Sequence, residues 1–368
     1  MKKTLCTSII ALLLCACLLA GCGSAAPAAP AQTEEVPAAA QDSAEAESPA
    51  AEETAPAAEE AAPVVEEAPE AAPDPELPIR VYTLNGTTGF GMAALIAESA
   101  EGKAALNYSF SVESDPSVVT AALVNGDCDI AALPTNAASA LYNKTGGKVQ
   151  VLALNTRGVL YLLTDGAVQP ESLEDLAGMT VYTPAQNPSF ILDALCRAKG
   201  VELTIDNSYA QPAELNAAVA AGEVGLAVLP EPMVTVACSQ NQNLKVALDL
   251  SAEWDKVMEP GSLVQGCVVV RREFAEAHGA ELACFLEEYG RSVALLGEDV
   301  QTAAQKIEET GIFAKAAVAA QAIPRCNICF VIGDEMQREL SVFLQSMFET
   351  APQSVGGSVP GDDFYYKG

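Results

Sequence analysis

Two stretches decide the fold, Asn125-Gly-Asp-Cys-Asp-Ile-Ala-Ala-Leu-Pro134 and Ala221-Gly-Glu-Val-Gly-Leu-Ala-Val-Leu-Pro230, because the second repeats the pattern of the first. In each, a glycine turn leads into an apolar run that ends in Leu-Pro, which is typical of a buried strand followed by a loop. Two further matches flank them in the same order: Val81–Thr83 recurs as Val181–Thr183, and the run Val149–Leu154 recurs as Lys245–Leu250. Strand–helix units share such composition in general, but three ordered matches at offsets of 100, 96 and about 95 residues favour an internal duplication.

Each copy predicts a βαβαβ unit with a parallel sheet, so the fold class is α/β. Ligand-facing loops lie beyond the carboxyl ends of such strands, and two units meeting edge to edge surround one central cleft. A later strand, Cys267–Val270, and a helical run from Arg272 to about Phe348 are expected to return to the first unit. The sequence therefore predicts lobe one from residues 78–155 and 266–368, and lobe two from residues 156–265. Asn155–Gly158 and Gln265–Gly266 are the expected hinge crossings, each with a glycine.

The first 22 residues are typical of a cleaved export signal. Lys2 and Lys3 precede an apolar run, Ile9–Ala20, that is too short to span a bilayer permanently. The run ends in Leu19-Ala-Gly-Cys22, which resembles the lipobox of bacterial lipoproteins. This resemblance implies cleavage before Cys22, acylation of its thiol, and a place on the extracytoplasmic face of the cell membrane.

Residues 23–77 have the composition of a linker. They contain 20 Ala, 9 Pro and 14 Asp or Glu, with no Lys, Arg or aromatic residue. We expect disorder, because so little apolar bulk cannot offset the entropy lost on ordering the chain. Such a stretch is a stalk through which the folded part reaches a membrane partner.

The folded part is acidic throughout. Subtracting the linker's 14 acids and the two signal lysines leaves 35 acidic and 17 basic residues in residues 78–368. With no basic stripe, nucleic acid is not an expected partner. We expect a monomer.

Cysteine and histidine usage argues against a metal, a cofactor and a catalytic centre. Seven cysteines follow Cys22, an odd number outside the cytoplasm, so a disulfide framework is not indicated. Cys326 and Cys329 have redox or metal spacing, and a local disulfide between them stays open. His278 is the only histidine, which leaves no Ser-His-Asp or Cys-His arrangement and no four-ligand zinc set.

Four runs carry a family resemblance: Leu84–Met92, Asp129–Asn136, Ser172–Gly178 and Val228–Thr235. They resemble the nitrate, sulfonate, taurine and thiamine-precursor receptors of ABC importers, over about residues 79–366. The resemblance implies a periplasmic-binding-protein fold of type II (a Venus flytrap), no catalysis, and delivery of a small solute to a permease and its ATPase. Two alternatives stay open: an enzyme of the same fold in menaquinone or thiamine-precursor synthesis, and a ligand-sensing receptor domain.

The loops after four predicted strands supply the candidate ligand-binding residues. We expect backbone N–H groups, hydroxyls and amides to hold the solute at helix N-termini. The residues are Gly86, Thr87, Thr88, Gly89, Thr135, Asn136, Asn155, Gln186, Asn187 and Glu231, with Tyr161, Trp254 and Arg157 as lesser candidates. Thr88 and Thr135 or Asn136 are equally expected as helix caps.

Glu231 stands between two prolines and decides the expected ligand charge. It is expected either to stabilise a helix start or to bind an amine, amidine or ring N–H. Since the four loops contain no Arg or Lys, the sequence favours a neutral or cationic ligand over an oxyanion. The identity of the ligand does not follow from the sequence.

Overall fold

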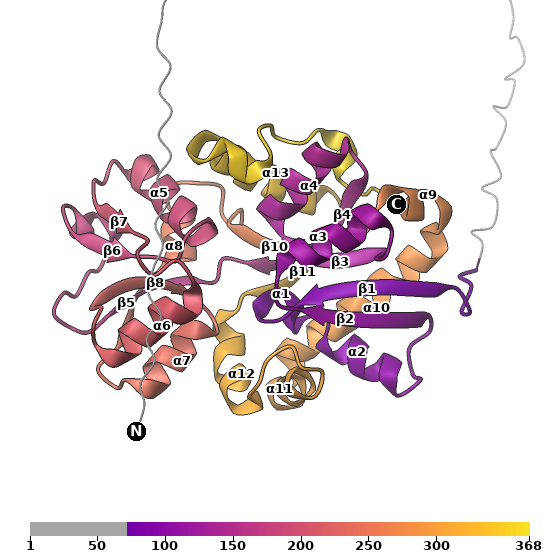
Figure 1. The fold of residues 1–368 in the computed structure, drawn as a ribbon, viewed down its shortest axis with the longest axis horizontal. Coiled ribbons are helices and arrows are strands. Elements are labelled where there is room, and N and C mark those ends of the chain that lie inside the picture. Colours follow the sequence, from indigo (N-terminus) through magenta and orange to yellow (C-terminus); the bar gives the residue numbers. More distant parts are fainter. Residues whose placement is uncertain (1–71) are drawn as a thin grey trace, which may run out of the picture. The chain divides into compact units, whose positions relative to one another are not determined.

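The computed structural model describes residues 72–368, whose strands form two separate sheets (Figure 1). Sheet one has the order β11-β4-β10-β3-β1-β2, and sheet two has the order β7-β6-β8-β5-β9. The strands of sheet one are β1 (Pro78–Leu84), β2 (Asn107–Glu113), β3 (Ile130–Pro134), β4 (Val149–Arg157), β10 (Val264–Arg271) and β11 (Ile328–Val331). Those of sheet two are β5 (Leu160–Thr164), β6 (Thr180–Tyr182), β7 (Thr204–Asp206), β8 (Leu226–Pro230) and β9 (Lys245–Asp249).

Helices cover both faces of each sheet, so the central strands are apolar on both sides. Sheet one carries α1 (Thr87–Phe90), α2 (Ala93–Ala100), α3 (Pro116–Asn125), α4 (Thr135–Thr145) and α9 to α13 (Arg272–Ala277, Gly279–Glu298, Val300–Glu309, Ala316–Ala322 and Gly333–Thr350). Sheet two carries α5 (Asn187–Lys199), α6 (Pro212–Ala221), α7 (Met233–Gln240) and α8 (Leu250–Trp254). We call sheet one with its helices lobe one, and sheet two with its helices lobe two.

The duplication is visible in the strand order. Strands β2-β1-β3-β10-β4 of sheet one correspond in position to β7-β6-β8-β5-β9 of sheet two. The expectation of a continuous parallel βαβαβ sheet is wrong in one respect, because an antiparallel strand separates the last two repeated strands in each copy. That strand is β10 in sheet one and β5 in sheet two. Each follows a crossing between the lobes, since the chain passes from β4 to β5 and from β9 through α8 to β10.

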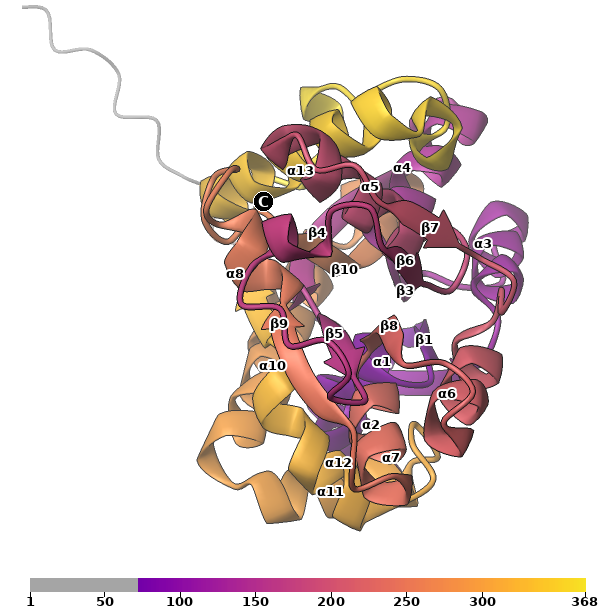
Figure 2. The ribbon, with the colours of Figure 1, turned by 90° about the vertical axis from the view of Figure 1, so that its left-hand side faces the viewer.

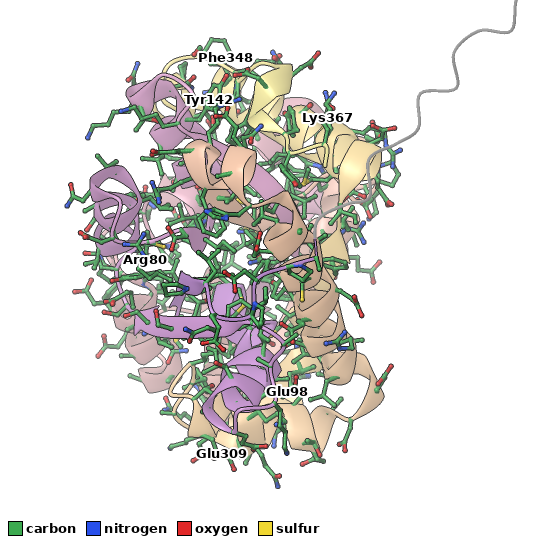
Figure 3. All side chains as sticks on the ribbon, turned by 90° about the vertical axis from the view of Figure 1, so that its right-hand side faces the viewer. Arg80, Glu98, Tyr142, Glu309, Phe348 and Lys367 are labelled. Atoms are coloured by element: carbon green, nitrogen blue, oxygen red, sulfur yellow. The ribbon has the colours of Figure 1, made fainter. Side chains whose placement is uncertain are left out.

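Strand Cys267–Val270 lies within β10 and pairs with β3 and β4 in sheet one. The helical run expected from Arg272 onward is interrupted by β11, which pairs with β4 at the edge of the same sheet. The last long helix, α13, contacts α4 of lobe one and α5 of lobe two, and Figure 2 shows it beside α5. Tyr142 on α4 and Phe348 on α13 lie at the same end of the molecule (Figure 3).

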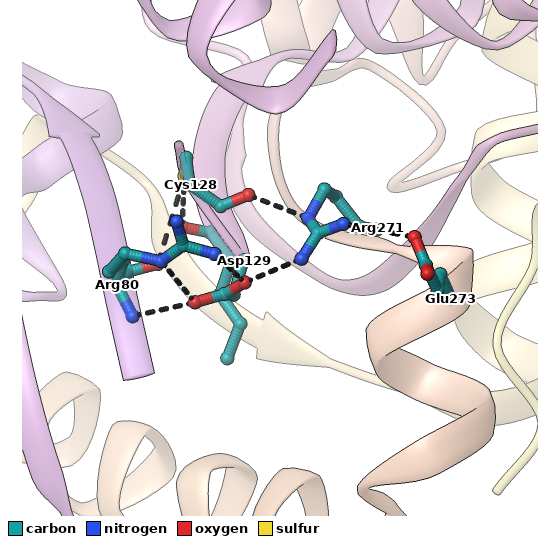
Figure 4. Close-up of polar contacts among 6 residues, drawn as sticks. Arg80, Cys128, Asp129, Arg271 and Glu273 are labelled. Carbon is teal, nitrogen blue, oxygen red and sulfur yellow. Dashed lines mark hydrogen bonds and ion pairs between the residues drawn. The ribbon is translucent and has the colours of Figure 1, made fainter. Parts of the chain in front are cut away.

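A buried aspartate, Asp129, forms ion pairs with two arginines at the end of sheet one where the parallel strands β1 and β3 begin. Asp129 accepts hydrogen bonds from the Arg80 guanidinium, at 2.9 and 2.6 Å, and from Arg271 Nη2 at 2.8 Å (Figure 4). Its side chain is 2% exposed. Burial by itself raises the pKa of Asp129, but the two arginines outweigh burial and hold the pKa below its usual value.

Candidate functional site

The loop after β1 needs glycine at two positions. Gly86 has a φ of 79°, in the left-handed region, and a Cβ on Gly89 would lie 2.0 Å from the Leu84 carbonyl oxygen. Helix α1 begins at Thr87 without a side-chain cap, so the expectation that Thr88 caps this helix is wrong. Thr87 and Thr88 are half-buried side chains next to this turn.

The buried side chain of Asn155 holds the loop after β1 in place through a hydrogen bond to its backbone. It is 1% exposed, and its Nδ2 donates to the Thr88 carbonyl oxygen at 3.2 Å. Its Oδ1 accepts from the Thr156 hydroxyl at 3.0 Å, and a Cβ on Gly266 would lie 2.3 Å from the same oxygen. Asn155 in β4 thus connects the candidate loop to both strands that lead between the lobes.

The loops after β3 and β6 meet across the two lobes. Asn187 Nδ2 donates to Asn136 Oδ1 at 2.7 Å. Helix α4 begins at Thr135 rather than near Ala137, and the Thr135 hydroxyl donates to the Val264 carbonyl oxygen at 2.7 Å. Neither α4 nor α5 has a side-chain cap or an acidic residue in its first turn, so the expected capping by Thr135 or Asn136 is wrong.

Gln186 and Asn187 start helix α5. Gln186 is exposed and has a φ of 66° at the N-cap position, which turns the chain into the helix. Asn187 Oδ1 is buried and has no hydrogen-bond partner within residues 72–368. The Ser354 hydroxyl is likewise buried and has no hydrogen-bond partner within these residues. The Ser354 carbonyl oxygen accepts a hydrogen bond from Asn136 Nδ2 at 3.4 Å. Two polar atoms thus remain available beside the contact between the lobes.

Glu231, after β8, is buried and occupied by protein partners. Its carboxylate accepts from the Thr235 backbone N–H at 3.1 Å and from the Thr235 hydroxyl at 3.0 Å. The expected role at a helix start is therefore confirmed, because Thr235 lies in the first turn of α7. The same carboxylate accepts from Arg325 Nε at 2.6 Å, and Arg325 Nη2 donates to the Thr235 hydroxyl at 2.8 Å.

Arg325 is the residue that sequence reasoning missed. It ends the short 3-10 turn Ile323–Arg325 that follows α12 in lobe one, so its bond to Glu231 joins the lobes. The Tyr161 hydroxyl adds a second link, because it donates to the Arg325 carbonyl oxygen at 2.9 Å. Pro324 indicated a break in the expected helix, since proline interrupts helical hydrogen bonding, but it did not indicate that Arg325 bonds the other lobe.

The remaining lesser candidates, Trp254 and Arg157, bond to other side chains of the protein. Trp254 is fully buried, and its Nε1 donates to the Ser262 hydroxyl at 2.8 Å. Arg157 makes two hydrogen bonds to the Glu339 carboxylate, at 3.2 and 2.7 Å. The polar groups of both side chains are therefore bonded to protein groups.

No group of three or more metal-ligating side chains occurs in the part of the chain that the structure describes. Cys326 and Cys329 are free thiols. Burial raises the pKa of the Cys329 thiol to about 12, so the thiolate that binds metals or attacks disulfides is scarce at neutral pH. The His278 ring packs against Phe274 at an interplanar angle of 39°, with ring centroids 4.6 Å apart, and its Nδ1 lies 3.8 Å from Glu281 Oε2.

The predicted signal, Cys22 and most of the linker lie outside the described residues. Within residues 72–368, none of the helices combines the length and apolar character that crossing a bilayer requires.

Three solved structures share this fold over four fifths of the chain. An ABC transporter protein from Parabacteroides distasonis has a TM-score of 0.68 and 23% identity, covering 80% of this chain and 99% of that one. The periplasmic aliphatic sulphonate-binding protein SsuA from Escherichia coli has a TM-score of 0.63 and 15% identity, covering 79% and 92%. The ligand-binding component of an ABC-type import system from Staphylococcus aureus, with zinc bound, has a TM-score of 0.60 and 15% identity, covering 79% and 97%.

The chain therefore has the fold of the periplasmic binding proteins of ABC importers, and the two-lobed α/β architecture expected from the sequence is confirmed. No protein-family model matches the sequence, and no curated protein matches it significantly.

Proposed function

We propose that this protein is the extracytoplasmic solute-binding component of an ABC import system. It captures a small molecule between the loops that follow β1, β3, β6 and β8 and delivers it to a membrane permease. The observation that carries this proposal is the meeting of loops from both sheets, through Asn136 and Asn187 on one side and Glu231 and Arg325 on the other. A site built from two lobes binds most tightly when the lobes are together, so ligand binding shifts the open–closed equilibrium.

The contacts of Glu231 change the proposed ligand class. The sequence favoured a neutral or cationic ligand, because Glu231 was the only charge in the four loops. Arg325 offsets that charge, and the uncapped first turns of α4 and α5 present N–H groups and positive dipole ends. We therefore propose that the ligand is a neutral hydrogen-bond acceptor or an anion. The binding of an aliphatic sulphonate by the Escherichia coli neighbour supports the same class.

Lipid anchoring belongs to the same proposal. Acylation at Cys22 fixes the chain to the outer face of the membrane, and residues 23–77 tether the two lobes near the permease. The protein acts as a monomer without a cofactor and catalyses no reaction.

A thermal-shift screen of the full chain tests the function. Sulfonates, nitrate, carboxylates, pyrimidines, flavins and amines are the compounds to compare, and a ligand at a hundred times its Kd adds about 2.7 kcal/mol of stability. The hit is then titrated by calorimetry against the parent and the Asn187→Ala variant, with Asn243→Ala on an exposed turn of lobe two as control. The expected result is weaker binding by Asn187→Ala alone. Equal affinity in all three proteins contradicts a site between the lobes.

The charge of the ligand is tested separately by Glu231→Gln, which keeps the side-chain size. Because the variant also weakens the bond to Arg325 that joins the lobes, its affinity is compared with that of Arg325→Ala, which loses the same bond but keeps the carboxylate. An anion should bind Glu231→Gln more tightly than Arg325→Ala. A cationic or N–H-donating ligand should lose about 1.5–3 kcal/mol, the range for a hydrogen bond to a charged group, and that loss would overturn the proposed ligand class.

A further inference from the structure

An apolar groove without acidic residues runs between α3 and α4 on lobe one. It encloses about 830 Å³ and is lined by Pro116, Ser117, Thr120, Ala121, Val124, Asn125, Ala137, Ala140, Leu141, Lys144, Thr145 and Lys148. Its only charged side chains are the two lysines. Both are exposed, and neither takes part in an ion pair within residues 72–368.

This groove differs from the rest of the protein in charge and in exposed apolar area. Residues 78–368 contain 35 acids and 17 bases, so a lining with two cations and no anion is a local inversion of the charge balance. Val124 is 55% exposed, the largest value among the large apolar side chains of the described residues. An occupant that covers Val124 and carries negative charge therefore fits the groove.

The chain itself contains a segment with this chemistry. Between Gly23 and Glu76, the only adjacent large aliphatic residues are Val64 and Val65. Two glutamates lie on each side of this pair, in the run Glu59-Glu-Ala-Ala-Pro-Val-Val-Glu-Glu67. We propose that residues 59–67 dock in the α3–α4 groove, with Val64 and Val65 against its apolar floor and the glutamates beside Lys144 and Lys148.

The distance along the chain allows this docking. Ala72, the first described residue, is seven residue steps along the chain from Val65, a stretch that spans at most roughly 24 Å. The chain then enters sheet one at Pro78, the start of β1, close to the ion pair of Arg80 with Asp129. The nearer end of the groove lies beside the starts of these strands, because α3 ends at Asn125 just before β3, the strand next to β1.

Tethering makes a weak contact sufficient. A segment joined by a short linker experiences an effective concentration in the millimolar range, so docking needs only modest affinity. Docking shortens the free tether from 55 residues to about 36, which draws lobe one toward the membrane anchor.

Photo-crosslinking in the full chain tests the proposal. A photoreactive amino acid replaces Val65, and mass spectrometry locates the crosslinked peptides in dilute protein. We expect intramolecular products on α3 and α4. Their yield should fall about tenfold in Lys144→Glu with Lys148→Glu, because two attractions become repulsions. Lys245→Glu with Lys315→Glu is the matched control, since both lysines are exposed and lie outside the groove.

Three outcomes overturn the proposal. The first is crosslinking spread over the surface, or left unchanged by charge reversal in the groove. The second is crosslinking between two chains, which makes a second copy the occupant. The third is an equal fall in the control variant, which shows that net charge alone is responsible. Circular dichroism of each variant establishes that it is folded, so that a lost product reports docking.

Discussion

Replacing Arg325 with alanine removes the charged connection between the lobes. In the structure, Arg325 Nε bonds Glu231 at 2.6 Å and Nη2 bonds the Thr235 hydroxyl at 2.8 Å. A hydrogen bond to a charged group contributes about 1.5–3 kcal/mol. Because the Arg325 side chain is 40% exposed, solvent screening places the loss toward the lower part of that range, about 2 kcal/mol.

This bond stabilises the closed form relative to the open form, because Arg325 and Glu231 belong to different lobes. A loss of about 2 kcal/mol shifts the open–closed equilibrium about thirtyfold toward the open form, at 1.4 kcal/mol for each factor of ten. The measurement is single-molecule energy transfer between dyes on bio-orthogonal amino acids at Lys103 and Gln242, which are exposed in lobes one and two. Arg338→Ala is the control, because its ion pair with Glu259 is exposed on both sides and is expected to contribute at most about 1 kcal/mol.

The expected result is a longer mean distance for Arg325→Ala and an unchanged distance for Arg338→Ala. The reasoning is refuted if Arg325→Ala lowers the free energy of unfolding but leaves the distance distribution identical to that of the parent. In that case the contact stabilises a fixed arrangement and does not contribute to closure.

Three further predictions follow from the contacts described above. Asp129→Asn should lower the free energy of unfolding by about 2–3 kcal/mol at pH 7, since it breaks a buried pair whose arginines are partly exposed. Because the pKa of Asp129 is lowered in the folded state, this contribution is complete above about pH 4 and is lost as pH falls through the folded pKa, so denaturation across pH should show a flatter profile for the variant. Gly266→Ala should cost about 1–3 kcal/mol through the clash with Asn155, and the double variant with Asn155→Gly should recover part of it; additive losses would contradict the clash. Cys22→Ser should release the protein from membranes, and lipid still found on the variant by mass spectrometry would exclude anchoring at this residue.

The sequence predicted best the parts of the fold that are local and repeated. Strands β1, β3, β6 and β8 were found because each is a short apolar run after a glycine or polar turn, and the duplication confirmed their order. Strand β2, with the sequence Asn-Tyr-Ser-Phe-Ser-Val-Glu, alternates polar and apolar residues strictly. It was missed because its counterpart β7 has only three residues, so the repeat contains no matching run. Strand β5 was missed because Leu160–Thr164 resembles a continuation of β4, and no local signal indicates that it joins the other sheet.

The sequence predicted which loops form the candidate site but not which side chains bond to each other across it. Asn136 follows β3 and Asn187 follows β6, which are not equivalent strands of the two copies, so the repeat predicted that both loops face the other lobe but not that these two side chains meet. The partner of Glu231 could not be predicted, since Arg325 is 94 residues away and its position depends on how α12 packs against lobe two. Long-range ion pairs of this kind are set by tertiary packing and leave no pattern in nearby sequence.

The two chain connections between the lobes, from β4 to β5 and from α8 to β10, are joined to each other by hydrogen bonds. Strands β4 and β10 pair side by side as far as Arg157 and Val264, where the chain leaves sheet one, and Gln265 Oε1 accepts from the Val159 backbone N–H at 2.8 Å just beyond. A two-stranded ribbon bends easily across its plane, but sliding one strand along the other breaks its ladder of hydrogen bonds. We therefore expect lobe two to swing about the ribbon rather than slide along it, so that the protein opens along one preferred direction.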